Sequence, residues 1–305
     1  MSALISLVEE ELGQPVLPEV RDFATAIAAR HAPASCAVLF YGSCLWARQL
    51  DGLMLDFYLI VDDYKSAYAK AWLAKANQWI PPNVFYAEHQ NLVAKYAVLS
   101  RADLARLCRA ESLSVSVWAR FAQPSALVWS RDEAARIDVI ESVAQAAPAL
   151  LQASRPLMPD EISVEHLWTQ AFAATYAAEL RAEKQQRGAT LFEANAARYR
   201  AFTALALQDA GLDATVHADR ITFLAPADTK AGARQWAKRR RHGKLMSVVR
   251  LLKASATFDG GIDYLAWKIT RHAGQPIHIR PWMRRLPILG GLWLLPALLR
   301  KGAVR

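Results

Sequence analysis

A glycine-serine turn and an isolated acid are the residues of this chain whose types and spacing best suit chemistry. The stretch FYGSCLWARQLDGLMLDFYLIV, residues 40–61, places Gly42 and Ser43 directly after an apolar run. Twelve residues separate Ser43 from Asp56, which interrupts a second apolar run. Backbone N–H groups of a turn bind phosphate oxygens, and glycine lets a phosphate approach closely. Because a carboxylate is a ligand that Mg²⁺ prefers, the pattern predicts a site for a phosphate-bearing ligand and a divalent ion.

A second carboxylate two residues after the first would share its face of the strand, but Tyr58 occupies that position. Asp62 has the right parity, yet six residues at about 3.3 Å each place it roughly 20 Å from Asp56. We expect Asp62 and the next acid to end the strand or cap the following helix. Glu88, on a proposed neighbouring strand about 5 Å away, is the preferred second metal ligand, with Asp51 in reserve.

The elements that must position these residues are short and mixed in type. Apolar runs rich in β-formers predict four buried strands, and helical spacing between and after them predicts helices. Ser100, with an acid three residues later, is typical of a helix N-cap. After about residue 150 the strand signal nearly vanishes, apart from one possible hairpin at 214–225. The predicted strands are 36–42, 53–61, 83–89 and 94–100, and a helix is predicted over 64–79, between the second and the third.

This pattern predicts an α/β (α+β) fold with a small mixed sheet, followed by a mainly helical basic domain. The proline-containing stretch 153–163 is the candidate linker, so the expected domains are 1–152 and 153–279, with a separate terminal segment at 280–305. A glycine-serine turn, a connection and a strand carboxylate together are typical of polymerase-β-type nucleotidyltransferases. The same residues also fit a common turn and an aspartate that pairs with a buried basic group.

Charged residues are unevenly distributed between the two halves of the chain. Residues 1–150 contain 13 Lys and Arg against 16 Asp and Glu, whereas residues 151–305 contain 24 against 12. Residues 238–305 alone hold 15 basic residues and two acids. We therefore expect the C-terminal part to bind an anionic partner. Three cysteines without paired or zinc-like spacing, and an N-terminus with three glutamates and no basic leader, predict an intracellular protein with reduced thiols.

The chain resembles the phosphatidate cytidylyltransferases of the translocator assembly and maintenance family, peripheral enzymes that make CDP-diacylglycerol in mitochondria and have bacterial relatives. The resemblance covers roughly residues 36–185, about half of the chain. Its order and spacing are more persuasive than any single motif. The stretches that carry it are FYGSCLW, MLDFYLIVDD, PNVFYAEHQNLVAKYAVLSRADLARLC, WARFAQPSALVW and, more loosely, FAATYAAELRAE.

The resemblance implies roles for individual residues. Gly42 and Ser43 match the nucleotide-binding turn, and Asp56 matches the single strand aspartate, which would hold Mg²⁺ beneath CTP. The family's Lys-Tyr pair corresponds to Lys95 and Tyr96. Its Tyr-x-x-acid-x-Arg helix corresponds to Tyr176, Glu179 and Arg181. The chain departs from the family at Cys44 and Ala97, where the family has glycine, and in lacking an evident histidine-containing stretch within 64–79.

The basic C-terminal segment predicts contact with a membrane surface. Residues 286–299 are 14 apolar residues between Arg284-Arg285 and Arg300-Lys301, whereas spanning a bilayer core takes about 20. Tryptophans and flanking cations favour a helix lying among lipid headgroups, and an ordinary buried terminal helix is the alternative. Arg250 and Lys253 either line an acceptor phosphate site or extend from a helical surface. The basic run KRRRHGK (238–244) more often marks a solvated helix face than a nucleic-acid site.

Taken together, these observations predict a phosphatidate cytidylyltransferase-like enzyme that uses Mg²⁺ to transfer CMP from CTP to phosphatidate. Lys95 would contact the triphosphate, and the enzyme would lie on the inner face of the membrane with an anionic phospholipid as its partner. One alternative is a catalytically inactive protein of the same fold that binds a membrane or a partner. Another is a nucleotidyltransferase with a soluble or nucleic-acid acceptor. The oligomeric state is left open.

Overall fold

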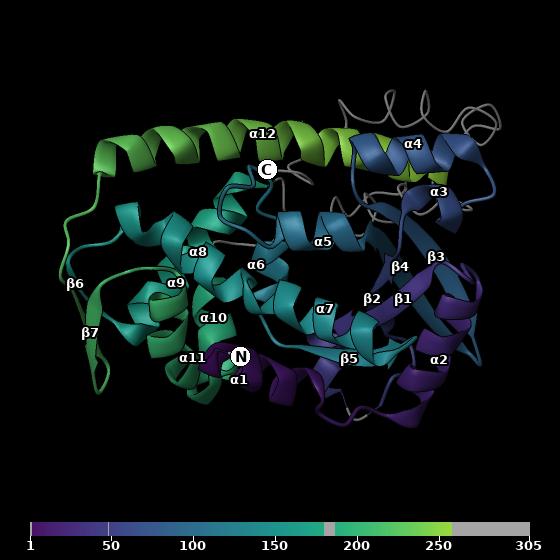
Figure 1. Ribbon diagram of the computed structural model, residues 1–305, viewed down its shortest axis with the longest axis horizontal. Helices are drawn as coiled ribbons and strands as arrows, with labels where there is room; N and C mark the ends of the chain where they lie inside the picture. The colour runs from purple at the N-terminus through teal and green to yellow at the C-terminus, as the bar shows by residue number, and fades with distance from the viewer. Residues whose placement is uncertain (1, 48, 180–186, 258–305) are drawn as a thin grey trace.

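The computed structural model describes residues 2–47, 49–179 and 187–257. Its N-terminal half contains a five-stranded sheet with helices on both faces (Figure 1). The elements of this half, in chain order, are α1 (Ala3–Leu12), α2 (Pro18–Ala29), β1 (Ser35–Tyr41), the 3₁₀ turn η1 (Ser43–Trp46), β2 (Met54–Val61), α3 (Tyr64–Ala67), α4 (Ala71–Trp79), β3 (Asn83–His89), β4 (Leu92–Ser100), α5 (Arg101–Leu107), α6 (Trp118–Phe121), β5 (Ser125–Ser130), α7 (Glu133–Ala144) and α8 (Ala146–Ser154).

The strand order in the sheet is β3-β4-β2-β1-β5. β2 is parallel to β4, and the other neighbouring pairs are antiparallel, so the sheet is mixed. Helices α2, α3 and α4 contribute side chains to the hydrophobic cluster on one face, and α1, α5 and α7 contribute to the cluster on the other. All seven residues of β1 are buried because both faces of this central strand are covered. The predicted α/β class with a small mixed sheet is confirmed.

Local sequence patterns predicted most of these strands and helix ends correctly. All four predicted strands are present, within two residues of their expected ends. Ser100 caps α5 by accepting a hydrogen bond from the backbone N–H of Asp103 at 3.1 Å, and Asp63 caps α3 in the same way. Strand β5 was not predicted, because its six residues carry no alternation that separates a strand from a short buried helix.

The helix predicted over 64–79 is instead two helices, α3 and α4, separated at Tyr68. The backbone of Tyr68 is extended, with φ −129° and ψ 127°, and its ring is buried. Its hydroxyl accepts a hydrogen bond from the side-chain amide of Asn77 at 3.1 Å. Burying this aromatic ring in the core therefore outweighs the continuation of the helix.

The described part of the second half, residues 155–179 and 187–257, is mainly helical, as expected. It adds a small sheet of order β6-β8-β7, in which β7 and β8 form the predicted hairpin. The elements are η2 (Arg155–Leu157), β6 (Glu161–Ser163), α9 (Val164–Ala178), α10 (Arg187–Ala194), α11 (Ala196–Asp209), β7 (Ala214–His217), β8 (Arg220–Phe223) and α12 (Thr229–Thr257).

The predicted boundary at 152/153 falls inside α8 and does not separate two cores. One hydrophobic cluster runs from Leu4 on α1 to Trp236 on α12. The proline-containing stretch that suggested a linker is held in place by Arg155, which is 5% exposed. Its guanidinium donates to the carbonyl oxygens of Met158 at 3.1 Å and Ala225 at 2.9 Å and pairs with Asp160. The predicted segment 280–305 lies outside the described residues.

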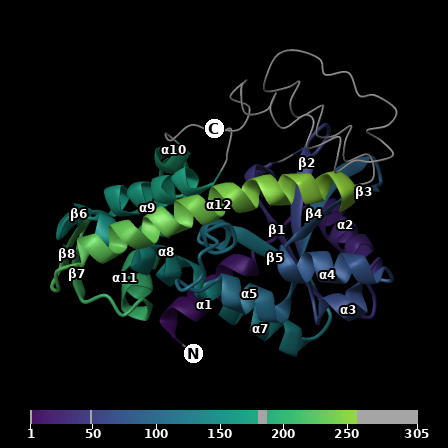
Figure 2. The ribbon, with the colours of Figure 1, turned by 90° about the horizontal axis from the view of Figure 1, so that it is seen from above.

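Helix α12 joins the two halves. Seen from above, it crosses from the β6–β8 side of the molecule to the edge of the large sheet (Figure 2). It contacts η2, α9 and β3 along the way. The contact with α9 is close, because a Cβ atom at Gly243 would lie 2.2 Å from the carbonyl oxygen of Ala178. Within the described part of the chain, no helix combines the length and the apolar character needed to cross a bilayer.

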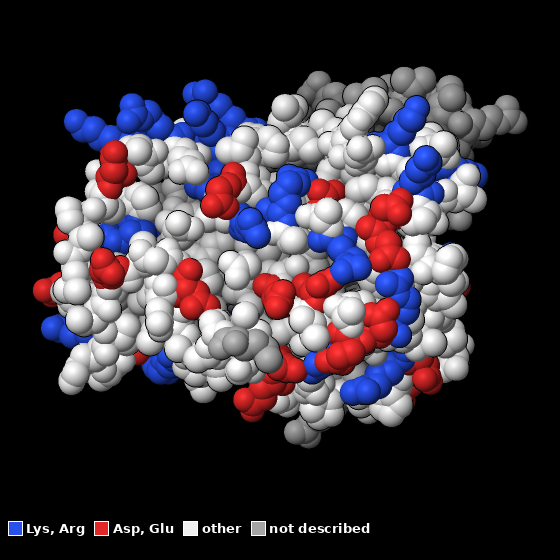
Figure 3. Space-filling view, in the orientation of Figure 1, with Lys and Arg blue, Asp and Glu red and all other residues white. Residues whose placement is uncertain are grey.

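Basic side chains gather along α12, at the upper edge of the surface in Figure 3. Lys230, Arg234, Lys238, Arg240, Arg241 and Lys244 are exposed there. Arg239 differs, because it is 1% exposed and donates to the carbonyl oxygen of Ala110 at 2.6 Å. The run KRRRHGK is therefore a solvated helix face except at Arg239 and Gly243, which pack inward, and His242, which is partly buried.

Candidate functional site

The glycine-serine turn lies against Asp56. β1 ends at Tyr41, which is opposite Asp56 in the antiparallel register with β2, so Gly42 begins the turn beside this acid. The backbone of Gly42 has φ +94° and ψ −166°, a conformation that is essentially restricted to glycine. A Cβ atom there would lie 3.3 Å from Oδ2 of Asp56. Glycine thus allows both the turn and its close approach to the carboxylate.

Lys95 faces Asp56 from the neighbouring strand. The two residues are partners in the parallel register of β2 and β4, so their side chains emerge on the same face of the sheet. The ammonium nitrogen of Lys95 lies 3.2 Å from Oδ1 of Asp56, and the side chains are 37% and 22% exposed, respectively. Apart from this ion pair, the buried Oδ1 has no hydrogen-bond partner among the described residues. The structure therefore brings together Gly42, Ser43, Asp56 and Lys95 from three separate parts of the sequence.

Tyr96, the other half of the Lys-Tyr pair, lies on the opposite face of the sheet. Successive side chains of a strand alternate between faces, so adjacent residues cannot line one site in the same way. The Tyr96 ring is 4% exposed, and its hydroxyl is 3.1 Å from Nε2 of His31. Tyr96 therefore cannot line a site at Asp56. The preceding residue, Lys95, lies beside that acid.

Glu88 does not lie beside Asp56. The expectation assumed that β3 is next to β2, but β4 lies between them. Two strand spacings correspond to about 10 Å, beyond the reach of two carboxylates that share one ion. Glu88 is exposed and accepts a hydrogen bond from the Tyr86 hydroxyl at 2.6 Å. Asp51, the reserve candidate, is exposed in the turn before β2.

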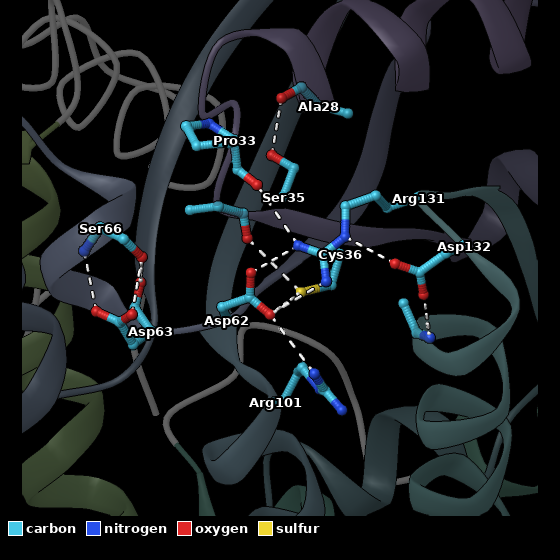
Figure 4. Close-up of polar contacts among 12 residues, drawn as sticks. Ala28, Pro33, Ser35, Cys36, Asp62, Asp63, Ser66, Arg101, Arg131 and Asp132 are labelled. Carbon is cyan, nitrogen blue, oxygen red and sulfur yellow. Dashed lines mark hydrogen bonds and ion pairs between the residues drawn. The ribbon is translucent and has the colours of Figure 1, made fainter.

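Asp62 belongs to a cationic cluster at the far end of β2 (Figure 4). Its carboxylate accepts a hydrogen bond from Arg131 at 2.6 Å and lies 3.5 Å from a guanidinium nitrogen of Arg101. The thiol of Cys36 donates to it at 3.1 Å. The hydrogen bond from Arg131 is the main reason that the pKa of Asp62 lies below its usual value. Asp62 thus ends the strand, as expected, and does not contribute to the site at Asp56.

Glu179 ends α9 and is 9% exposed. Its negative charge favours the charged forms of Arg120 on α6 and Arg250 on α12, although burial lowers the pKa of Arg250 overall. Glu179, the acid of the Tyr-x-x-acid-x-Arg motif, therefore acts on two arginines of the first and last parts of the described chain. Arg181, its basic member, lies outside the described residues.

Arg250 connects α12 to the sheet edge. Its guanidinium donates to the carbonyl oxygen of Pro81 at 2.9 Å and to the hydroxyls of Ser114 and Ser116, both at 3.1 Å. Burial lowers the pKa of Arg250, while the charge of Glu179 and the Tyr58 hydroxyl oppose that shift. Nearby, Lys253 donates to the carbonyl oxygen of Pro82 at 2.7 Å, and burial lowers its pKa to about 7. Both cations hold α12 in place, and neither is an exposed surface residue.

Arg120 is a site residue that sequence reasoning missed. It lies on α6 within the stretch WARFAQPSALVW, where only its charge in an apolar context distinguishes it. Its guanidinium carbon is 4.7 Å from the centre of the Tyr41 ring, on the strand position opposite Asp56. Burial lowers its pKa, but the surrounding Tyr41, Tyr58, Asp56 and Glu179 raise it more, so Arg120 is firmly charged.

The side chains around Asp56 suit a metal ion that binds together with a substrate better than a permanently bound ion. Among the described residues, no group of three His, Cys, Asp or Glu side chains is placed to hold a metal. Mg²⁺ is usually bound by one or two carboxylates together with substrate phosphates. Asp56 fits that arrangement, because Oδ1 has only the ion pair with Lys95 and Gly42 leaves space beside Oδ2.

Comparisons with known proteins leave the family unassigned. No protein-family model matches the chain, and no curated protein is similar to it. Among solved structures, a nucleotidyltransferase-like protein from Exiguobacterium sibiricum 255-15 is similar over 93% of this chain and 91% of its own, with 11% identity and a TM-score of 0.28. A TM-score this low supports no conclusion about function.

Proposed function

We propose that the protein is a nucleotidyltransferase whose site is formed by the Gly42–Ser43 turn, Asp56 and Lys95. The observation that carries this proposal is the meeting of a glycine-only turn with a carboxylate that in turn faces a lysine. A turn of this kind offers backbone N–H groups to phosphates, and Lys95 offers a positive charge at the same place. The arrangement suits a nucleoside triphosphate better than an uncharged ligand.

In the proposed reaction an oxygen of a phosphate monoester attacks the α-phosphorus of the triphosphate. A new P–O bond forms, the bond between the α-phosphorus and its bridging oxygen breaks, and pyrophosphate leaves with the electron pair. A phosphate monoester is already a nucleophile at neutral pH, so the site needs no strong base. The chain's contribution is to orient the triphosphate on the turn at Gly42 and to offset its charge with Lys95.

Asp56 is the residue that would hold Mg²⁺ together with the substrate phosphates. When bound, this ion offsets negative charge on the triphosphate oxygens. In the absence of substrate, Lys95 occupies the neighbourhood of the same carboxylate at 3.2 Å. Binding of the triphosphate would give Lys95 a new anionic partner and leave Asp56 available to the ion.

The finer proposal is that CTP is the donor and phosphatidate the acceptor, giving CDP-diacylglycerol. It is supported by the resemblance of residues 36–185 to phosphatidate cytidylyltransferases and by the excess of basic residues toward the C-terminus. The sequence of 280–305 suits a segment that lies on an anionic membrane, which is where a lipid acceptor would be found. We therefore propose a peripheral membrane enzyme.

A second candidate is an inactive protein of the same fold that binds a membrane or a partner. The observation in its favour is that Asp56 already pairs with Lys95 and belongs to no metal-binding group of three acids, histidines or cysteines among the described residues. A nucleotidyltransferase with a soluble or nucleic-acid acceptor is a third candidate, in which the same site residues would act.

The test is pyrophosphate release by the purified full-length protein with Mg²⁺ and each of the four ribonucleoside triphosphates, with and without phosphatidate vesicles. We expect release with CTP and phosphatidate, and loss of that release in Asp56→Asn. Asp219→Asn is a matched control, because this acid pairs with Arg200 on the surface of the β7–β8 hairpin. Absence of release under every condition would favour the inactive candidate.

Membrane attachment through 280–305 is tested by comparing two acceptors. Deleting 280–305 should lower turnover on phosphatidate in vesicles while leaving turnover on a short-chain, water-soluble phosphatidate unchanged. Equal loss on both acceptors would show that this segment supports the fold or the active site and not attachment to lipid.

A further inference from the structure

Arg120 occupies a fixed position beside the candidate site. It lies on the single turn α6, between Trp118 and Phe121, whose side chains are at most 2% exposed. These two aromatic anchors, together with the buried Ala119, determine where the Arg120 side chain leaves the backbone. Its guanidinium then stacks over Tyr41, at 4.7 Å from the ring centre.

The Arg120 guanidinium has no hydrogen-bond acceptor among residues 2–47, 49–179 and 187–257. Its Nε atom is buried and unpartnered, and none of its nitrogens forms an ion pair with a described carboxylate. Buried polar groups in proteins are nearly always hydrogen-bonded, so an exception of this kind requires an explanation. A ligand that supplies oxygen acceptors would be one.

Other arginines that pack into the molecule have acceptors. Arg155 donates to two carbonyl oxygens and pairs with Asp160, and Arg250 donates to a carbonyl oxygen and two hydroxyls. Arg239 shares the unpartnered Nε atom, but its guanidinium still donates to the carbonyl oxygen of Ala110. Arg198 pairs with Glu11, donates to the carbonyl oxygen of Ala122 at 3.0 Å and stacks on Phe202 at 4.1 Å. Arg198 therefore resembles Arg120 in stacking on an aromatic ring and differs in having its nitrogens satisfied.

The charges that surround Arg120 leave room for an anion. Asp56 and Glu179 act on Arg120, but each of them also acts on a second cation: Asp56 pairs with Lys95, and Glu179 acts on Arg250. Neither acid is therefore reserved for Arg120. A guanidinium binds phosphate oxygens in a planar, bidentate manner.

We propose that Arg120 binds a phosphate group of the substrate, either on the nucleoside triphosphate or on the acceptor. This inference rests on the proposed function and adds to it a cationic residue that touches substrate. Stacking on Tyr41 holds the guanidinium plane while its nitrogens stay available for phosphate oxygens.

The experiment compares Arg120→Gln and Arg120→Lys with the full-length wild type. Binding of inorganic tripolyphosphate is measured by calorimetry without turnover, and KM is measured separately for CTP and for phosphatidate vesicles. Loss of one charge-assisted interaction predicts weakening by about 10-fold to 100-fold in Arg120→Gln. Arg120→Lys retains the charge but not the planar fork, so we expect partial recovery.

The two phosphate sources give different patterns. Weaker tripolyphosphate binding together with a raised KM for CTP assigns Arg120 to the triphosphate. Unchanged tripolyphosphate binding with a raised KM for phosphatidate assigns it to the acceptor. Arg198→Lys is the control for structural arginines, because it should lower the melting temperature without changing either KM.

Failure of the inference differs from failure of the proposed function. If the wild type turns over CTP and both folded Arg120 variants retain its tripolyphosphate affinity and both KM values, Arg120 does not touch substrate and the inference alone is overturned. If the wild type neither binds tripolyphosphate nor releases pyrophosphate, both are overturned. Arg120→Lys keeps the comparison possible if Arg120→Gln does not fold, since its charge and stem preserve most of the packing.

Discussion

The two faces of the large sheet treat their polar residues differently. On the face that carries Tyr96, neutral polar side chains bond one another: His31 lies 3.0 Å from the carbonyl oxygen of Ala67 and 3.1 Å from the Tyr96 hydroxyl, although Oδ1 of Asn83 has no partner. On the face that carries Asp56, charged groups meet instead: Oδ1 of Asp56 makes only an ion pair with Lys95, and Nε of Arg120 makes no hydrogen bond to a described residue. Neutral groups that bond one another stabilise a fold, whereas charged groups gathered in one place suit a charged ligand.

On the face that carries Tyr96, the hydrogen bonds determine which nitrogen of His31 is protonated. A carbonyl oxygen only accepts hydrogen bonds, so Nδ1 of His31 carries the proton and Nε2 accepts from the Tyr96 hydroxyl. Asn77 continues the pattern, donating to Tyr68 at 3.1 Å and to the carbonyl oxygen of Val98 at 2.9 Å. This network holds the strands beneath the site without taking part in it.

Separate substitutions of Lys95 and Tyr96 are the strongest test of this comparison, because these adjacent residues lie on opposite faces of the sheet. Lys95→Met should lower turnover by about 100-fold, since the triphosphate loses a positive charge. Its free energy of unfolding should change by less than about 1 kcal/mol, because the pair with Asp56 is partly exposed. Turnover and urea denaturation measure the two quantities.

Tyr96→Phe is the matched variant and should behave in the opposite way. Removing its hydroxyl leaves Nε2 of His31 unpaired in a buried place, which costs about 1–3 kcal/mol of stability. Its turnover should stay within about twofold of the wild type under conditions where it is folded. A large loss of turnover with intact stability would place Tyr96 in the site and contradict the division between faces.

Gly42→Ala should reduce both stability and turnover. The backbone conformation at this position is strained for any residue with a Cβ atom, at a cost on the order of 1–3 kcal/mol. The added methyl group would also press on Oδ2 of Asp56, 3.3 Å away. We expect turnover to fall about 10-fold in addition to the loss of stability. Turnover equal to that of the wild type would show that the turn does not position the reacting groups.

The burial of His31, on the face that carries Tyr96, predicts a pH dependence of stability. Burial is the main cause that lowers the pKa of His31 below its ordinary value of 6.5, and the charge of Arg30 adds to it. Below pH 6.5 the unfolded chain therefore binds a proton that the folded chain does not, and the free energy of unfolding falls as pH falls. The slope is at most about 1.4 kcal/mol per pH unit and ends at the folded-state pKa.

Denaturation of the wild type and His31→Gln between pH 5 and 8 checks this expectation. The variant lacks the titrating group, so its stability should depend less on pH below 6.5. Equal slopes in the two proteins would show that His31 titrates alike in the folded and unfolded states.

Glu88→Gln should have the smallest effect. Glu88 is exposed and two strands away from Asp56, so turnover and its Mg²⁺ dependence should match those of the wild type within about twofold. A raised Mg²⁺ requirement would show that this acid reaches the ion after all. Titration of Mg²⁺ at saturating substrate makes the comparison.

Sequence reasoning succeeded where the signal is local. The strands on either side of Gly42, the turn itself and the cap at Ser100 depend on residues close together in the chain. It was less successful where the outcome depends on distant packing. Glu88 was placed beside Asp56 because neighbouring strands in sequence are often neighbours in a sheet. The insertion of β4 between β2 and β3 made that assumption wrong.

The residues themselves determined that a glycine turn and a strand carboxylate meet, because an antiparallel pair closed by a short connection brings its adjoining ends together. Only the tertiary structure decided which cations join them. The parallel pairing of β2 with β4 selects Lys95 and turns Tyr96 away, and the packing of α6 and α12 against the sheet brings in Arg120 and Arg250. Strand order and helix packing are set by burial of apolar surface across the whole chain, which no short stretch of sequence contains.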